Sequence, residues 1–123
     1  MNEKKNLTTK ETFDLAVQNQ QKNNLQVAEN LYKETLKTNP NHVEAHNNLG
    51  IVFKELGELQ KAVDCHQKAI QIQPEDAYSY YNLGLVFKEL GELQEAINCF
   101  QKVIQIFEFA PIMFLNKKWI QND

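Results

Sequence analysis

The side chains that could do chemistry in this sequence are few, and two histidines come first. His42 and His46 are four residues apart, so on a helix their imidazoles would share one face and could bind a metal ion. His42, however, falls in the turn directly before the expected helix, and His46 occupies a packing position. No further Cys, His or acidic residue lies at a suitable spacing, so we expect no metal and no cofactor.

Catalysis needs convergent groups, such as a nucleophile beside a base or two carboxylates in different environments. The sequence offers no such group and no glycine-rich phosphate loop. Its two Lys-Glu-Leu-Gly-Glu runs, at residues 54–58 and 88–92, are typical of solvated helix ends. We therefore expect a protein that is not an enzyme.

Composition and charge narrow the possible partners. The chain has 13 Lys and Arg against 16 Asp and Glu, a formal net charge of -3, which is the wrong balance for a nucleic-acid-binding face. No apolar run reaches the roughly 20 residues that span a bilayer, and the first residues lack the apolar core of a secretory signal. We expect a cytoplasmic protein without nucleic-acid or membrane partners.

A repeat organises the chain. The segment from Val43 to Asp76 is nearly copied by the residues after it, at a step of 34 that relates Leu49 to Leu83. A fixed period of this size predicts stacked helix pairs. We expect a flexible N-terminus (1–8), a divergent first repeat (9–42), a second (43–76), a third (77–110) and a C-terminal segment (111–123).

Apolar residues at helical spacing predict two helices in each repeat. In the second repeat the helices should run from about 43 to 56 and from about 59 to 72. Gly57 and Gly91 mark the turns, and Asn23 takes this place in the first repeat because asparagine tolerates left-handed backbone. Thr8 and Glu11 have the spacing of a capping box, which predicts the start of the first helix.

Packing between helices explains the remaining special residues. Gly50 is small where two helices must approach closely, and His66 stands where Phe100 stands one repeat later, as a packing substitute. Cys65 and Cys99 also hold equivalent places. They are interpreted as small buried residues, because free cysteine is often buried and a cytosolic setting disfavours disulfides. A disulfide between them is the alternative.

The repeat pattern resembles the tetratricopeptide repeat family. The residues that carry the resemblance are His46, Leu49-Gly50, Phe53, Gly57, Ala62, His66, Ala69 and Pro74, then Tyr80, Leu83-Gly84, Phe87, Gly91, Ala96, Phe100 and Val103. The resemblance implies an all-α fold, an α-solenoid of three helix-turn-helix repeats in a right-handed superhelix. The residues that precede each Leu-Gly, Asn47-Asn48 and Tyr81-Asn82, are also similar to those of the N-terminal arm of O-linked N-acetylglucosamine transferase-like proteins.

In that family the first helices of the repeats line a concave groove that binds partner peptides. Carried over by position, the resemblance implies peptide-binding residues at Asp14, Asn47, Asn48, Ile51, Lys54, Tyr78, Tyr81, Asn82, Leu85 and Lys88. A side-chain amide both donates and accepts, so a row of asparagines can bind an extended backbone of any sequence. We predict a non-catalytic protein-interaction module that binds an extended peptide or helix. The alternative is a truncated N-terminal repeat arm of a multidomain transferase, such as a protein O-glycosyltransferase.

The segment after Ile106 departs from the repeat. Glu108 stands where the closing proline is expected, and Lys117 and Lys118 occupy the Leu-Gly position among several large apolar residues. Three interpretations stay open. The segment could form a capping helix from about 111 to 121 that lies on the third repeat. It could instead be an apolar edge through which copies of the chain associate, or the end of a chain whose relatives continue into further repeats.

Overall fold

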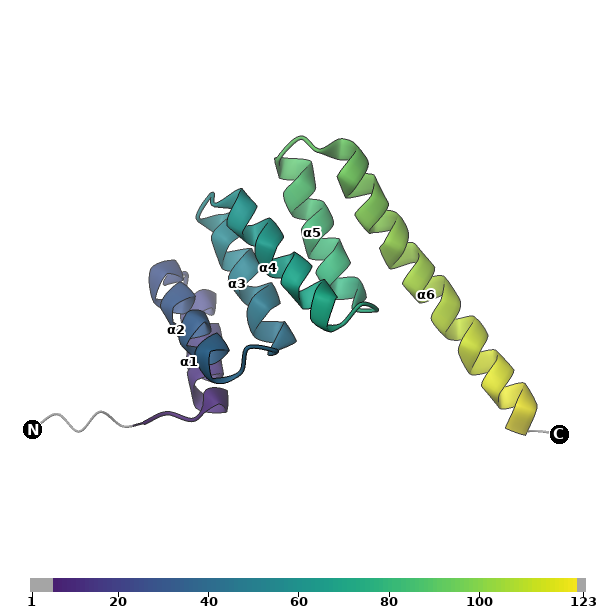
Figure 1. Cartoon of the computed structure of the whole chain (residues 1–123), viewed down its shortest axis with the longest axis horizontal. Helices are drawn as coiled ribbons and strands as arrows, with labels where there is room; N and C mark the ends of the chain where they lie inside the picture. Colours follow the sequence, from purple (N-terminus) through teal and green to yellow (C-terminus); the bar gives the residue numbers. More distant parts are fainter. Residues whose placement is uncertain (1–5, 122–123) are drawn as a thin grey trace, which may run out of the picture.

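The computed structural model describes the backbone of residues 6–121 and the side chains of residues 6–108. This part of the chain contains six helices and no strand: α1 (Thr9–Gln21), α2 (Leu25–Thr38), α3 (Val43–Glu55), α4 (Leu59–Ile72), α5 (Ala77–Glu89) and α6 (Leu93–Gln121). The helices form three hairpins that follow one another along the molecule (Figure 1). The predicted all-α solenoid of helix pairs is confirmed.

A residue in left-handed backbone conformation closes each hairpin. The φ angle is 63° at Asn23, 79° at Gly57 and 78° at Gly91. Glycine takes this conformation without steric cost, and asparagine is one of the few other residues that adopts it readily. The three predicted turns are therefore confirmed.

The first helix of each hairpin begins at a side-chain cap. Thr8 Oγ1 accepts from the backbone of Glu11 at 3.1 Å, and Glu11 Oε1 accepts from the backbone of Thr8 at 3.0 Å, which confirms the predicted capping box. His42 and Asp76 hold the equivalent place at the start of α3 and α5 and also accept backbone hydrogen bonds. These caps satisfy backbone donors that no helical carbonyl can reach.

The core lies between successive helices and continues from one hairpin to the next. Within each hairpin the two helices pack together, and α3 and α5 pack against the preceding α2 and α4. The buried core residues are Ala16, Ala28, Tyr32, Ala45, Leu49, Val52, Phe53, Ala62, Val63, Leu83, Val86 and Cys99. Full burial of one large apolar side chain contributes about 1.5–3 kcal/mol, so each hairpin is stabilised by its neighbours.

Two glycines allow the paired helices to come close. A Cβ atom at Gly50 would lie 2.6 Å from Cε1 of His66, and one at Gly84 would lie 2.6 Å from Cε1 of Phe100. His66 is completely buried. It therefore fills the same space as Phe100, as predicted for a packing substitute.

Both cysteines are free, Cys99 buried and Cys65 partly so. Burial raises the pKa of the Cys65 thiol to about 12 and also raises the pKa of Cys99. The interpretation of both as packing residues is confirmed, and the disulfide alternative is wrong for this structure.

The C-terminal segment is continuous with the last helix. The sequence predicts a new segment from residue 111, but α6 runs without interruption from Leu93 to Gln121 and extends past the end of α5 (Figure 1). Pro74 and Asp76 end α4 and start α5, whereas the equivalent residues are Glu108 and Ala110, neither of which stops a helix. The segment is thus helical, but the expected start of a helix at about residue 111 is wrong, because the segment continues α6. The packing of its side chains lies outside the described residues.

None of the helices in the described part of the chain is both long and apolar enough to cross a membrane.

Candidate functional site

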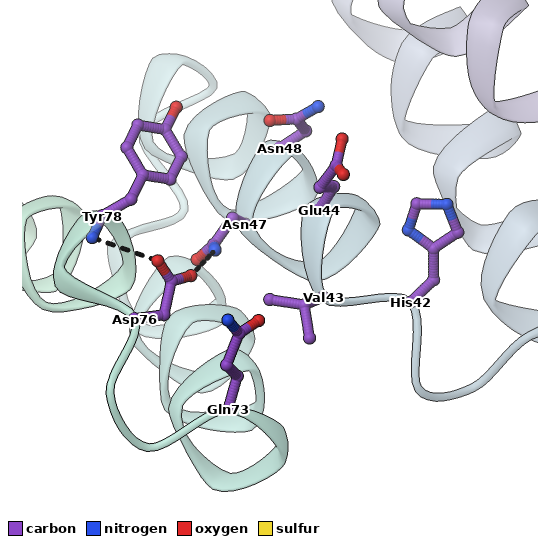
Figure 2. A pocket seen from close by; sticks show the side chains of 8 residues that line it. All are labelled: His42, Val43, Glu44, Asn47, Asn48, Gln73, Asp76 and Tyr78. Carbon is purple, nitrogen blue, oxygen red and sulfur yellow. Dashed lines mark hydrogen bonds between the residues drawn. The ribbon is translucent and has the colours of Figure 1, made fainter. Parts of the chain in front are cut away.

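A cavity of about 460 Å³ opens between the N-terminal ends of α3 and α5 and the end of α4. Figure 2 shows its lining, in which polar side chains predominate: His42, Val43, Glu44, Asn47, Asn48, Gln73, Asp76 and Tyr78. Three amides, two carboxylates, an imidazole and a phenol converge on one space. Such a lining can bind a ligand through hydrogen bonds and aromatic contact.

The accessible rim of the cavity consists of Glu44, Asn48 and Tyr78. Glu44 is exposed, Asn48 is half-buried, and 52% of the surface of Tyr78 is exposed. Tyrosine presents a large apolar ring with a polar tip, a combination enriched at binding surfaces. The predicted site residues Asn48 and Tyr78 are therefore brought together on one rim.

Asn47 closes the floor of the cavity and is only 1% exposed. Its Nδ2 donates to Ser79 Oγ at 2.8 Å and lies 3.4 Å from Asp76 Oδ2 (Figure 2 shows the second contact). Asn47, which the resemblance places among the peptide-binding residues, is thus buried, and its amide is bonded within the protein.

The hydrogen bonds of this floor have a fixed direction. The Asp76 carboxylate can only accept, so Ser79 donates to it at 2.7 Å and must itself accept from Asn47 Nδ2. The Asn47 oxygen then faces His66 Nδ1 at 3.0 Å, which requires that Nδ1 carries the proton. This chain of bonds joins α4, α3 and α5 across the boundary between the second and third hairpins.

The other ring nitrogen of His66, Nε2, is buried and has no hydrogen-bond partner among the described residues. Burial, with a smaller contribution from Lys54, lowers the pKa of His66 to about 4. The imidazole is therefore neutral at pH 7. Because it is fully buried, it packs the hairpin instead of serving as an acid, a base or a metal ligand.

The histidine pair considered for metal binding has other contacts. His42 Nδ1 accepts from the backbone of Ala45 at 3.1 Å, and its ring stacks on Phe13 with centroids 4.5 Å apart. His46 Nε2 lies 2.8 Å from the carbonyl oxygen of Pro40. Within residues 6–108 no group of three or more metal-ligating side chains comes together.

The remaining predicted site residues lie away from the cavity. Asn82 is 8% exposed and its Nδ2 donates to the Tyr78 carbonyl at 2.9 Å. Its side chain is therefore less accessible to a ligand than the half-buried Asn48. Asp14 is exposed and pairs with Lys10 at 2.8 Å. Along α3 and α5, half-buried side chains are Ile51, Lys54 and Leu85, and exposed ones are Tyr81 and Lys88.

Sequence reasoning missed part of the lining. His42 and Asp76 are cap residues, and Gln73 ends α4. A cap residue lies where one hairpin passes to the next, so its side chain is close to the groove. His42 and Asp76 are 34 residues apart, so the repeat period already indicated that they hold equivalent positions.

The fold is a helical repeat scaffold with a polar cavity on its first helices. The tetratricopeptide repeat family matches residues 43–108, more than half of the chain, and the chain therefore belongs to this family. The fold is typically that of a non-catalytic protein-interaction module.

Among solved structures, the chain is similar to crystal structures of MamA. One matches with a TM-score of 0.81 and 25% identity, over 85% of this chain and 61% of that chain. A second has a TM-score of 0.78 and 26% identity, over 82% and 55% of the two chains. The chain thus spans less than two thirds of the length of these proteins. A search of curated protein sequences finds no match.

Proposed function

We propose that this chain binds an extended peptide or a helix of a partner protein on the surface formed by α1, α3 and α5, with the cavity of Figure 2 as the main contact. The cavity is the observation that carries the proposal. Its rim offers a carboxylate, an amide and a half-exposed phenol, while its floor is fixed by buried hydrogen bonds. A rigid floor beneath an accessible rim reduces the entropy lost on binding.

The lining indicates the chemistry of the ligand. The Asn48 amide can accept from one backbone N–H and donate to a neighbouring carbonyl, with about 0.5–1.5 kcal/mol net for each bond. Glu44 and Asp76 give the cavity two carboxylates, and no Lys lines it. We therefore expect a peptide with a basic side chain next to an aromatic or aliphatic one.

Further contacts extend along the same two helices. Ile51 and Leu85 provide half-buried apolar surface, and Lys54 and Lys88 lie near the C-terminal ends of α3 and α5. Exposed Glu55 and Glu89 stand beside these lysines, so this end of the groove carries charges of both signs. Asp14 and Tyr81 would extend the contact to either side.

Partner capture from a lysate on the immobilised full chain tests the groove. We expect the double variant Asn48→Ala and Tyr78→Ala to lose most captured partners, because it removes the amide and the ring from the rim. The matched control, Gln60→Ala with Asn98→Ala, changes two exposed side chains of α4 and α6 and should capture as the wild type does. Circular dichroism verifies the fold. Unchanged capture by the rim variant would reject the groove.

Charge reversal at the rim gives a second readout. Glu44→Lys should lose partners that present a basic side chain and should leave circular dichroism unchanged, because Glu44 is exposed. Stronger capture of the same partners would show that the carboxylate is not part of the recognition.

Two predictions from the sequence stay predictions. These are the cytoplasmic location and the alternative that the chain is the repeat arm of a multidomain transferase. No contact among the described residues favours that alternative over the groove.

A further inference from the structure

The cavity between α3 and α5 has two carboxylates and no positive charge in its lining. Glu44 and Asp76 both line it, and no lysine does. In residues 6–108 neither carboxylate forms an ion pair, since the lysines that pair there meet other acidic residues. His42 adds no charge, because its Nδ1 accepts from the backbone of Ala45 and therefore carries no proton. The lining thus favours a cationic ligand group.

The two carboxylates differ in their access to a ligand. Asp76 is half-buried and already accepts from the backbone of Tyr78 at 3.3 Å and from Ser79 Oγ at 2.7 Å. Both of these donors are neutral, so the negative charge stays in the floor of the cavity. Glu44 is exposed at the rim, so its two oxygens are open to a ligand.

The amide of Asn48 is oriented by a tyrosine behind the cavity. Tyr32 of α2 is fully buried and donates its only hydroxyl proton to Gln20 Oε1, so toward Asn48 its oxygen can only accept. Burial raises the pKa of Tyr32 to about 12, and its contact with Asn48 acts in the opposite direction, as a donor to the phenol oxygen does. The nitrogen of Asn48 therefore faces Tyr32, and its oxygen lies on the side of Tyr78 (Figure 2).

We infer that the cavity binds the guanidinium group of an arginine side chain in the bound peptide. This inference rests on the proposed groove function and names the side chain that the cavity selects. The planar guanidinium can donate two parallel hydrogen bonds to the Glu44 carboxylate and a further one to the Asn48 oxygen. It also stacks on aromatic rings, and Tyr78 offers a ring that is 52% exposed. The ammonium of lysine is compact and strongly hydrated, and it has no flat face to stack.

The arginine comes from another protein, because none of the 123 residues of this chain is an arginine. Glu44, Asn48 and Tyr78 contact the guanidinium. Tyr32 does not reach it and is a positioning residue, which acts through Asn48.

NMR titration of the isotope-labelled full chain with three blocked tripeptides tests the inference. The peptides are acetyl-Ala-Arg-Ala-amide and the same peptide with lysine or with citrulline, the neutral analogue of arginine, in the middle. The arginine peptide should shift the amide signals of residues 43–48 and 76–78. It should bind about tenfold more tightly than the citrulline peptide, because charged hydrogen bonds are lost with the charge. The lysine peptide should bind between the two.

Two rim variants separate the charge from the ring. Glu44→Gln should weaken binding of the arginine peptide about tenfold, whereas Glu55→Gln, an exposed change at the other end of α3, should not alter it. Tyr78→Leu should remove the preference for arginine over lysine, because it keeps apolar surface and loses the aromatic face. Tyr81→Leu is its matched control, since Tyr81 is 47% exposed on the same helix but does not line the cavity.

A double-mutant cycle tests the positioning role of Tyr32. Tyr32→Phe should weaken binding of the arginine peptide in the wild type, because Asn48 loses the acceptor that orients its amide. In an Asn48→Ala background the same change should have no effect on binding. A purely structural role of Tyr32 would weaken binding equally in both backgrounds, and that result would reject the positioning.

The arginine inference is overturned if the three tripeptides bind alike, if none of them binds, or if the signals that shift lie outside the cavity. Partner capture distinguishes this failure from that of the groove. If the tripeptides bind alike while Asn48→Ala with Tyr78→Ala loses its captured partners, the groove stands and its ligand is not arginine. If that variant captures as the wild type does, the groove itself is rejected, whichever tripeptide binds.

Discussion

At the residue scale, one pair of equivalent positions is aromatic in two hairpins and polar in the middle one. In the first and third hairpins the pair is aromatic: Phe13 lies 5.9 Å from Tyr32, and Tyr81 lies 6.1 Å from Phe100, between ring centroids. In the middle hairpin the pair is Asn47 and His66, joined by a hydrogen bond of 3.0 Å. A polar pair in this place needs further partners, and Ser79 and Asp76 from the next hairpin supply them.

Stability should fall in mild acid because of His66. Its pKa is about 4 in the folded protein, below the ordinary value of 6.5 that the unfolded chain retains. The unfolded chain therefore binds the proton first, so stability is constant above about 6.5, decreases as the pH falls toward 4, and then levels off. The loss is roughly 3 kcal/mol, since one pKa unit corresponds to about 1.4 kcal/mol.

Urea unfolding across this pH range measures the loss. His66→Phe, which copies Phe100, should remove most of the slope with pH. Burial also lowers the pKa of His46, so a smaller slope of the same sign should persist. An unchanged slope in His66→Phe would assign the dependence to another group.

Gly50→Ala should destabilise the protein although alanine is the better helix former. The new Cβ would lie 2.6 Å from the His66 ring, which is fully buried, so the ring or the helices would have to shift. We expect a loss of about 1–3 kcal/mol, as for other overpacked cores. Urea unfolding of the single variant measures this loss.

A double-mutant cycle isolates the contact. In a His66→Ala background, Gly50→Ala should be neutral or stabilising, because the ring that it meets is gone. Gly57→Ala is the control, since nothing lies near its Cβ position and its cost comes from a φ of 79°. That cost should be the same in both backgrounds. An equal effect of Gly50→Ala in both would reject the close contact.

At the element scale, the hairpins are joined by different chemistry at each boundary. Phe13 of α1 stacks on the cap residue His42 of the second hairpin. At the equivalent place Asn47 of α3 contacts the cap residue Asp76 of the third. The first boundary is therefore aromatic, and the second is a buried hydrogen-bond chain.

Asn47→Ala should loosen the second boundary. The change leaves the buried His66 Nδ1 without a partner, which costs about 1–3 kcal/mol, and removes the donor to Ser79 Oγ, which keeps its bond to Asp76. Urea unfolding measures the loss. Asn98→Ala, at an exposed position of α6, is the control and should change stability by less than about 0.5 kcal/mol. Equal stability of the two variants would show that the chain of bonds contributes nothing.

The elements themselves were predictable because each depends on local chemistry. Helix period, turn residues such as Asn23 and the cap at Thr8 set the helix limits in the sequence, and the structure has them there. The burial of Asn47 was not predictable in this way. It depends on Ser79 and Asp76, about one repeat further along the chain, so only the packed structure shows that its amide is occupied. The unbroken α6 was missed for a related reason, since a missing turn signal was interpreted as a new segment.

At the scale of the whole molecule, the stack has one covered hairpin and two ends. In the described chain α3 and α4 have neighbours on both sides, whereas α1 and α6 each face another helix on one side only. Repeat proteins gain stability from contacts between neighbouring units, so hairpins at the ends open more easily. The cavity lies at the junction of the covered hairpin with the third.

Hydrogen exchange should show this order directly. Amides of α3 and α4 should exchange most slowly and those of α1 and α6 fastest, as measured by mass spectrometry of peptic fragments. Equal exchange rates in all hairpins would mean that the stack opens as one unit. In that case the rim of the cavity would owe its rigidity to the whole molecule, and the covered middle hairpin would give it no special protection.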